Sequence, residues 1–127
     1  MTSTARELAT FLANVDREAV PERALDTAAM FLASTLASAG LGASIPSAQV
    51  MRQLARDRRG PADATMWFSD GPKMGVIEVA QANAVSSGAA ACDDSDLRNI
   101  VHAGSSMTAV ALALGERLGS SGPDDPR

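Results

Sequence analysis

The sequence has few aromatic residues and almost no cysteine. Its 127 residues include three Phe, one Trp, no Tyr and a single Cys. One cysteine excludes an internal disulfide framework, so we expect a protein of a reducing compartment. Basic residues are outnumbered, 11 against 15 acidic ones, which gives a net charge of -4. Binding along a nucleic-acid backbone needs a basic face, so this balance argues against a nucleic-acid partner.

The sequence also lacks a recognisable targeting segment or membrane anchor. Residues 1–13 have neither the basic start nor the long apolar run of a signal peptide. The longest weakly polar stretch, residues 28–45, is interrupted by Ser, Thr and Gly, which disfavour partition into lipid. We therefore expect a cytoplasmic protein that does not interact with a membrane.

Alanine, and not aromatic residues, supplies much of the apolar content of the chain. It accounts for 25 of the 127 residues, and hydrophobic residues make up 46% of the chain. Alanine is the best helix former and a poor strand former. The length fits one domain with one core. The composition therefore predicts an all-α protein, a compact bundle of four to five helices.

Capping residues and prolines place the first two helices. Thr4 and Glu7 have the spacing of a capping box, which predicts a helix over 4–14. Pro21 suits the first turn of a second helix that is expected to run to about residue 39. Gly40 and Gly42 are expected to end this helix, because glycine readily takes up the left-handed conformation of a helix C-terminus.

The second half of the chain predicts three more helices. One starts at Pro46 and ends in the basic run 56–59, which is either a solvated helix end or an anion site. Residues 64–69 form a short strand or an extended loop, and two helices follow at 75–90 and 105–118. The helix over 75–90 lacks a wide polar face, so we expect other elements to bury it on most sides. The neighbouring predicted helices are short and have few apolar residues, which suggests that a partner chain completes the core. We expect a helical domain over 1–119 and a flexible tail over 120–127.

The reactive side chains gather between the last two predicted helices. Residues 92–102 contain the only Cys, the only His and three acids, Asp93, Asp94 and Asp96. Like charges repel, which favours proton uptake by one of the carboxylates, and His102 can exchange a proton near neutral pH. Alternatively, the acids cap the following helix and the histidine is structural. The spacing fits neither a zinc nor a magnesium site, so no metal is predicted.

Several short stretches occur in a characteristic order along the chain. They are Val20-Pro21-Glu22, Leu32 to Leu36, Ala64-Thr65-Met66-Trp67, Ala80-Gln81-Ala82-Asn83-Ala84, Asp93-Asp94-Ser95, His102, and Ala109 to Glu116. In this order and spacing they resemble the N-terminal helical part of the MmgE/PrpD family, from Thr4 to about Gly119. That family contains 2-methylcitrate dehydratase, cis-aconitate decarboxylase and related isomerases.

The resemblance implies a lyase or isomerase step that needs no cofactor. The substrate would be a small carboxylate or 3-oxo-type acid, and the step would be dehydration, decarboxylation, isomerisation or cyclisation. Asp93 and Asp94 fall on the family's Asp pair and would position or polarise the substrate. Ser95 would donate a hydrogen bond, and His102 would carry the proton.

Two further residues are predicted to bind substrate. Arg98 could meet a substrate carboxylate, although a solvent-facing loop charge is the alternative. Asn83 falls on the Asn of the family's Asn-Gly-x-x-Ala-His run.

The chain also departs from the family pattern. It has Ala91 in place of an acid, Ala89 in place of a His, Ala84 in place of the Gly after the Asn, and Ala103 in place of the Pro after the His. Family members are longer chains with a lid domain that supplies further catalytic groups.

Three hypotheses remain open. The chain is the small subunit of a split enzyme beside a larger family-like chain, an inactive helper or dimerisation domain for a full-length relative, or a free-standing small enzyme or binding protein that forms a homodimer.

Overall fold

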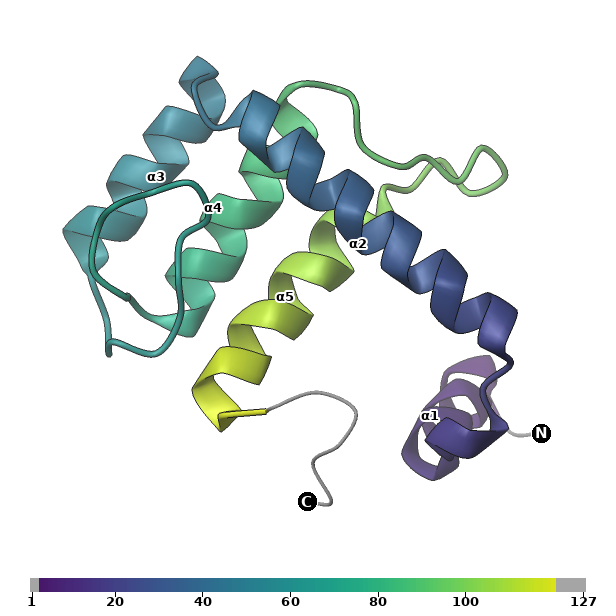
Figure 1. The fold of residues 1–127 in the computed structure, drawn as a ribbon. Helices are drawn as coiled ribbons and strands as arrows, with labels where there is room; N and C mark the ends of the chain where they lie inside the picture. The colour runs from purple at the N-terminus through teal and green to yellow at the C-terminus, as the bar shows by residue number, and fades with distance from the viewer. Residues whose placement is uncertain (1–2, 121–127) are drawn as a thin grey trace. The chain divides into compact units, whose positions relative to one another are not determined.

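The computed structural model describes residues 3–120, which divide after Met30 into two compact units. The described chain contains five α-helices and one short 3-10 helix. They are α1 (Thr4–Asn14), η1 (Arg17–Ala19), α2 (Glu22–Gly42), α3 (Pro46–Arg58), α4 (Val76–Ala89) and α5 (Ala103–Leu118) (Figure 1). Extended pairing in the described part is limited to the isolated antiparallel bridges Ala64–Met74 and Asp96–Val101. The predicted all-α class is confirmed.

The first unit contains α1, which has the predicted bounds but a different cap. Ser3 is the N-cap residue, and its hydroxyl accepts a 3.4 Å hydrogen bond from the backbone N–H of Arg6. The predicted capping box at Thr4 was therefore one residue too late, and Thr4 is the first helical residue. No residue of α1 is buried, and Phe11 and Leu12 are 63% and 60% exposed. This helix presents apolar surface without contributing a core residue.

The second helix is longer than predicted. α2 continues three residues past the predicted end at about residue 39, so Gly40 lies within the helix and Gly42 is its last residue. A Cβ atom at position 42 would overlap the backbone carbonyl oxygen of Ser86 in α4, and one at position 40 would lie 3.4 Å from the Phe68 ring. These glycines allow close packing against the C-terminal part of α2, which is the physical reason that the helix continues past residue 39.

The core of the second unit is built around α4, which lies between α3 and α5 (Figure 1). Small residues dominate this core, and the largest fully buried apolar side chains are Met66 and Val79. The main cluster consists of Ala55, Ala64, Met66, Met74, Val79, Ala80, Ala82 and Ala113. Because alanine projects so little, the helices approach closely and leave a thin apolar core.

The remaining helices agree with the predictions to within two residues. Pro46 begins α3, and α4 is one residue shorter at each end than the predicted 75–90. α5 begins at Ala103, before the predicted residue 105, because a side chain from the preceding loop caps its first turn. Residues 64–69 form a loop, in which only Ala64 pairs with Met74. The predicted tail over 120–127 stays a prediction, since residues 121–127 lie outside the described chain.

One helix in the described chain is long and apolar enough to cross a membrane. α2 has 21 residues and a mean hydropathy of 1.3 in its most apolar window. Core helices of soluble proteins and signal sequences pass the same test, so the observation is weak evidence. The predicted cytoplasmic location and lack of membrane contact stay predictions.

Candidate active site

The loop over residues 90–102 connects α4 to α5, and we refer to it as the acid loop (Figure 1). Two of its carboxylates meet the first turn of α5. Asp94 Oδ2 accepts a 3.0 Å hydrogen bond from the backbone N–H of Gly104, and Asp93 Oδ2 accepts one of 2.6 Å from the Ser105 hydroxyl. A helix N-terminus has unpaired N–H groups and a partial positive charge, so the two carboxylates stabilise it. The capping role considered from the sequence is therefore present.

The same two aspartates hold the imidazole of His102. Nδ1 lies 2.7 Å from the backbone carbonyl oxygen of Asp94 and 3.4 Å from Asp93 Oδ2. A carbonyl oxygen can only accept, so this contact requires the proton on Nδ1. The Asp93 side chain is only 5% exposed, whereas that of His102 is 53% exposed. In the neutral ring Nε2 then carries the lone pair, which is the arrangement of a general base beside an orienting carboxylate.

A glycine makes room for this arrangement. A Cβ atom at position 104 would overlap Asp94 Oδ1 and lie 3.1 Å from the Thr35 hydroxyl of α2. Within residues 3–120, Asp94 Oδ1 and Thr35 Oγ1 are the buried side-chain oxygens that have no hydrogen-bond partner. The site thus includes Thr35. The sequence analysis did not select this residue, because the position of Thr35 in a helix does not by itself distinguish a site residue from a core residue.

The outer part of the acid loop forms an exposed turn. Asp96 accepts hydrogen bonds from the Asn99 side chain at 2.6 Å and from the backbone N–H of Arg98 at 2.9 Å. The hydrogen bond from the Asn99 side chain, and to a lesser extent that from the Arg98 backbone, holds the pKa of Asp96 below its usual value. Ser95 and Arg98 are both exposed, and no hydrogen bond within the described chain links their side chains to His102. The structure therefore brings together three of the predicted catalytic residues and leaves Ser95 and Arg98 at the surface.

Asn83 occupies a buried position on α4 and uses its whole amide group. Its Oδ1 accepts a 3.0 Å hydrogen bond from the backbone N–H of Trp67, and its Nδ2 donates one of 3.2 Å to the carbonyl oxygen of Thr65. The side chain is 1% exposed. Asn83 therefore attaches the loop before α4 to that helix, a structural role that the sequence did not reveal. Its predicted contact with substrate stays a prediction.

The acidic, cysteine and histidine side chains of the described residues do not form a metal site. Across residues 3–120, no three side chains of His, Cys, Asp or Glu are grouped so that they could hold a metal ion. The free Cys92 is exposed, and its Sγ donates to the Ala90 carbonyl oxygen at 3.3 Å. No residue is assigned to a cofactor.

The family model of the MmgE/PrpD N-terminal domain matches residues 6–125, nearly the whole chain. The protein belongs to the MmgE/PrpD family. Searches of curated proteins and of solved structures gave no match. The acid loop, Asn83 and Thr35 all lie within the matched range.

The structure gives physical meaning to two departures from the MmgE/PrpD pattern. Ala103, where the resemblance places Pro, is the first helical residue of α5, a position that favours proline because its N–H has no helical acceptor. Ala91, where the resemblance places an acid, has a φ of 51°, which is uncommon for alanine. The backbone of this chain therefore accommodates alanine at both positions.

Proposed function

We propose that this MmgE/PrpD domain supplies the proton-transfer group of a lyase or isomerase that acts on a small carboxylate or 3-oxo-type acid. The observation that carries the proposal is the position of His102. Its Nδ1 is fixed by the Asp94 carbonyl oxygen beside the buried Asp93 carboxylate, while the ring is half exposed. An imidazole held in this way has one defined tautomer and one ring nitrogen free to exchange a proton.

The proposed step is removal of a proton from carbon next to a carbonyl or carboxylate group. Nε2 of His102 takes the proton, and the C–H electron pair becomes an enolate. The Asp93 carboxylate, 3.4 Å from Nδ1, stabilises the imidazolium cation that forms. In a lyase the enolate then expels a leaving group, and in an isomerase the proton returns elsewhere. Ser95 and Arg98 would meet the substrate's oxygens on the exposed side of the loop.

We further propose that a second chain covers this site. Proton abstraction from carbon benefits from exclusion of water, and the His102 ring is 53% exposed. The same loop also exposes apolar side chains, since Leu97 and Ile100 are 90% and 85% exposed. Exposed apolar groups in a cluster favour a protein partner. The proposed partner is a larger family-like subunit, or a second copy of this chain.

The test uses the full chain, tagged and purified both alone and with whatever co-purifies from its own cells. Light scattering and thermal circular dichroism report assembly and folding. Deuterium incorporation from D2O into citrate, 2-methylcitrate and cis-aconitate, followed by NMR, reports proton transfer independently of the final product. We expect exchange in the assembled protein, and His102→Ala should reduce it by roughly a hundredfold or more while assembly is retained.

The matched control is Ser106→Ala, which alters an exposed hydroxyl one turn into α5 whose bond goes to the Ala103 carbonyl oxygen. It should leave exchange unchanged. Unchanged exchange in His102→Ala would overturn the catalytic role and support the inactive helper, a role that the missing acid at Ala91 favours. A cooperatively folding, monodisperse monomer without exchange would overturn the proposed assembly, whereas a stable homodimer without exchange would support a free-standing binding protein.

A further inference from the structure

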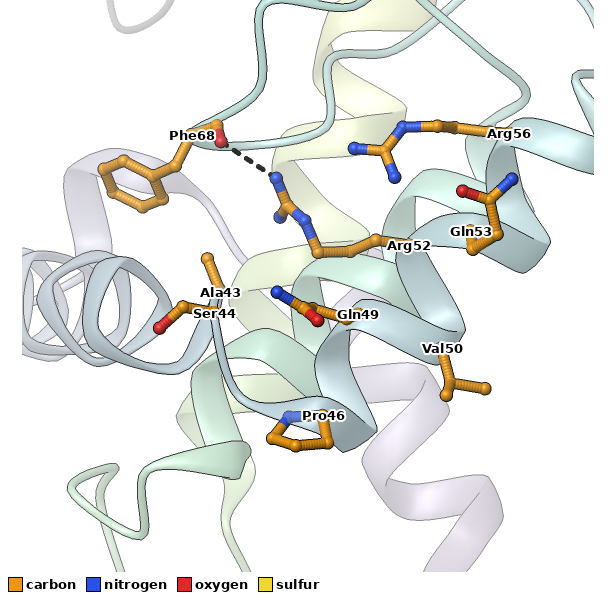
Figure 2. Close-up of a pocket in the computed structure, with 9 residues that line it drawn as sticks. All are labelled: Ala43, Ser44, Pro46, Gln49, Val50, Arg52, Gln53, Arg56 and Phe68. Carbon is orange, nitrogen blue, oxygen red and sulfur yellow. Dashed lines mark hydrogen bonds between the residues drawn. The ribbon is translucent and has the colours of Figure 1, made fainter.

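A second candidate site lies on α3 and shares no residue with the acid loop. An open pocket of about 750 Å³ is present between this helix, the turn before it and the loop that carries Phe68. We refer to it as the arginine pocket. Figure 2 shows the residues that line it, which are Ala43, Ser44, Pro46, Gln49, Val50, Arg52, Gln53, Arg56 and Phe68. No acidic residue is among them, although the chain as a whole is acidic.

Arg52 is a buried cation without an acidic partner. The residue is 5% exposed, and its guanidinium donates 2.9 Å hydrogen bonds to the carbonyl oxygens of Trp67 and Phe68. Both acceptors are neutral. Lys73, His102 and Arg117 each have a carboxylate within 4.0 Å, and none of these ion pairs involves Arg52. Because burial of an unpaired charge is unfavourable, this position favours an anion as a further partner.

Arg56 adds a second positive charge on the same side of α3. It lies four residues after Arg52, and Figure 2 shows both guanidinium groups directed toward the loop that carries Phe68. Burial and the charge of Arg56, in that order, lower the pKa of Arg52. The nearest acid in sequence, Asp57, accepts a 2.9 Å hydrogen bond from Gln53 instead. An anion between the two arginines would remove their mutual repulsion.

The pocket also has apolar lining residues, with Phe68 at one end and Val50 at the other (Figure 2). Val50 and Phe68 are 67% and 60% exposed, and Pro46 lies nearby. Phe68 has a φ of 54°, a conformation that bulky side chains rarely adopt. In this conformation its carbonyl oxygen meets Arg52 while its ring stays exposed beside the pocket (Figure 2). A pair of cations beside an exposed aromatic ring fits an organic anion better than a bare inorganic ion.

We propose that the arginine pocket binds a small organic anion. Its doubly charged phosphate or dicarboxylate group lies between Arg52 and Arg56, and its carbon skeleton contacts the Phe68 ring. Guanidinium groups suit both kinds of anion, because their planar N–H donors match pairs of oxygen atoms. This binding site is additional to the proton-transfer site, and its occupation requires no turnover.

The test is direct binding to the full chain, measured by isothermal titration calorimetry with inorganic phosphate, phenyl phosphate and succinate. Trp67, the only tryptophan, lies next to the pocket and gives a fluorescence signal for phosphate and succinate. We expect Arg56→Gln to weaken binding by about tenfold or more, the loss of one charge-assisted hydrogen bond. Arg58→Gln is the matched control, since it removes the same charge from the same helix at a residue that does not line the pocket.

The outcomes separate the possible ligands. A preference for phenyl phosphate over inorganic phosphate supports contact with the Phe68 ring, and a preference for succinate identifies a dicarboxylate site. Equal weakening in both variants would overturn the proposal, because it would indicate attraction to the overall charge of α3. Failure of all three probes to bind the folded chain at about 10 mM would also overturn it. Both variants alter exposed side chains, and circular dichroism verifies that each remains folded.

Discussion

At the scale of single residues, buried polar side chains hold the loops of this protein to its helices. Asn83 fixes the loop before α4 through two backbone groups, and Arg52 fixes the next part of the same loop through two carbonyl oxygens. Asp94 caps α5 and at the same time orients His102 through its own carbonyl. Where the core is thin, such bonds decide which conformation the loops adopt.

Asn83→Ala should lower the free energy of unfolding by about 2–3 kcal/mol, because two backbone groups of a partly buried loop lose their partner. Urea denaturation followed by circular dichroism measures the change. Gln81→Ala, at an exposed position two residues earlier on α4, is the control and should change stability by less than about 0.5 kcal/mol. A similarly small effect of Asn83→Ala would contradict the structural role and strengthen the predicted substrate contact.

Glu116 makes a pH-dependent connection between α5 and the same loop. Its carboxylate accepts hydrogen bonds from the Thr65 hydroxyl at 2.7 Å and the Thr65 N–H at 3.2 Å, and it lies 3.1 Å from Lys73 Nζ. Burial raises the pKa of Glu116, but the bonds from Thr65 and Lys73 outweigh it and leave this pKa lowered. The lowered folded-state pKa means that the stabilisation is present above the unfolded-state pKa and is lost as the pH falls through the folded-state value.

We therefore expect Glu116→Gln to lower the free energy of unfolding by about 1 kcal/mol at pH 7, a modest value because the side chain is 30% exposed. The difference from the unmodified chain should shrink as the pH falls from about 5 to about 3. Urea denaturation across this range measures it. A difference that stays constant with pH would show that ionisation of Glu116 does not contribute.

At the scale of elements, glycine decides how closely helices approach. In α2, Gly42 lies against the Ser86 carbonyl oxygen of α4, and any side chain there would force the two segments apart. In α5, Gly115 has no atom within 4 Å of the place where a Cβ would lie. The two glycines have the same helical secondary structure but opposite packing environments.

Gly42→Ala should destabilise the protein by about 2–3 kcal/mol through overpacking, with a lower midpoint of thermal unfolding. Gly115→Ala is the paired control and should stabilise it by about 0.5–1 kcal/mol, because alanine favours the helix and meets no neighbour. Thermal circular dichroism of both variants measures these shifts. If Gly42→Ala were neutral or stabilising, the close contact between α2 and α4 would be wrong.

At the scale of the whole molecule, the described chain exposes more apolar surface than its small core explains. The cluster around α4 consists largely of alanine, while α5 alone exposes Met107 and Leu118 by 66% and 71%. Alanine buries little area per residue, so the chain gains less hydrophobic stabilisation than one with larger core residues. The proposed partner chain would cover this surface, and the proposed activity would then depend on assembly.

The sequence by itself determined the helical class, most helix bounds and the family. Alanine content and the prolines at helix starts act locally, and they operate in the same way in any tertiary context. The acid loop was also predictable, since the reactive residues are concentrated between two helices. Capping of α5 by these acids was one of the alternatives, but the contacts of Asp93 and Asp94 with His102 were not predictable, because they depend on the path of the loop.

Only the tertiary structure decided which glycines end a helix and which allow close packing. Gly40 and Gly42 have the local signature of a helix end, but contacts with Phe68 and Ser86 lie far away in sequence. The arginine pocket likewise depends on carbonyl oxygens of residues 67 and 68, which meet α3 only in the folded chain. Secondary-structure propensity depends on residues that are neighbours in the sequence, whereas steric fit and burial of charge arise only where segments distant in sequence come into contact.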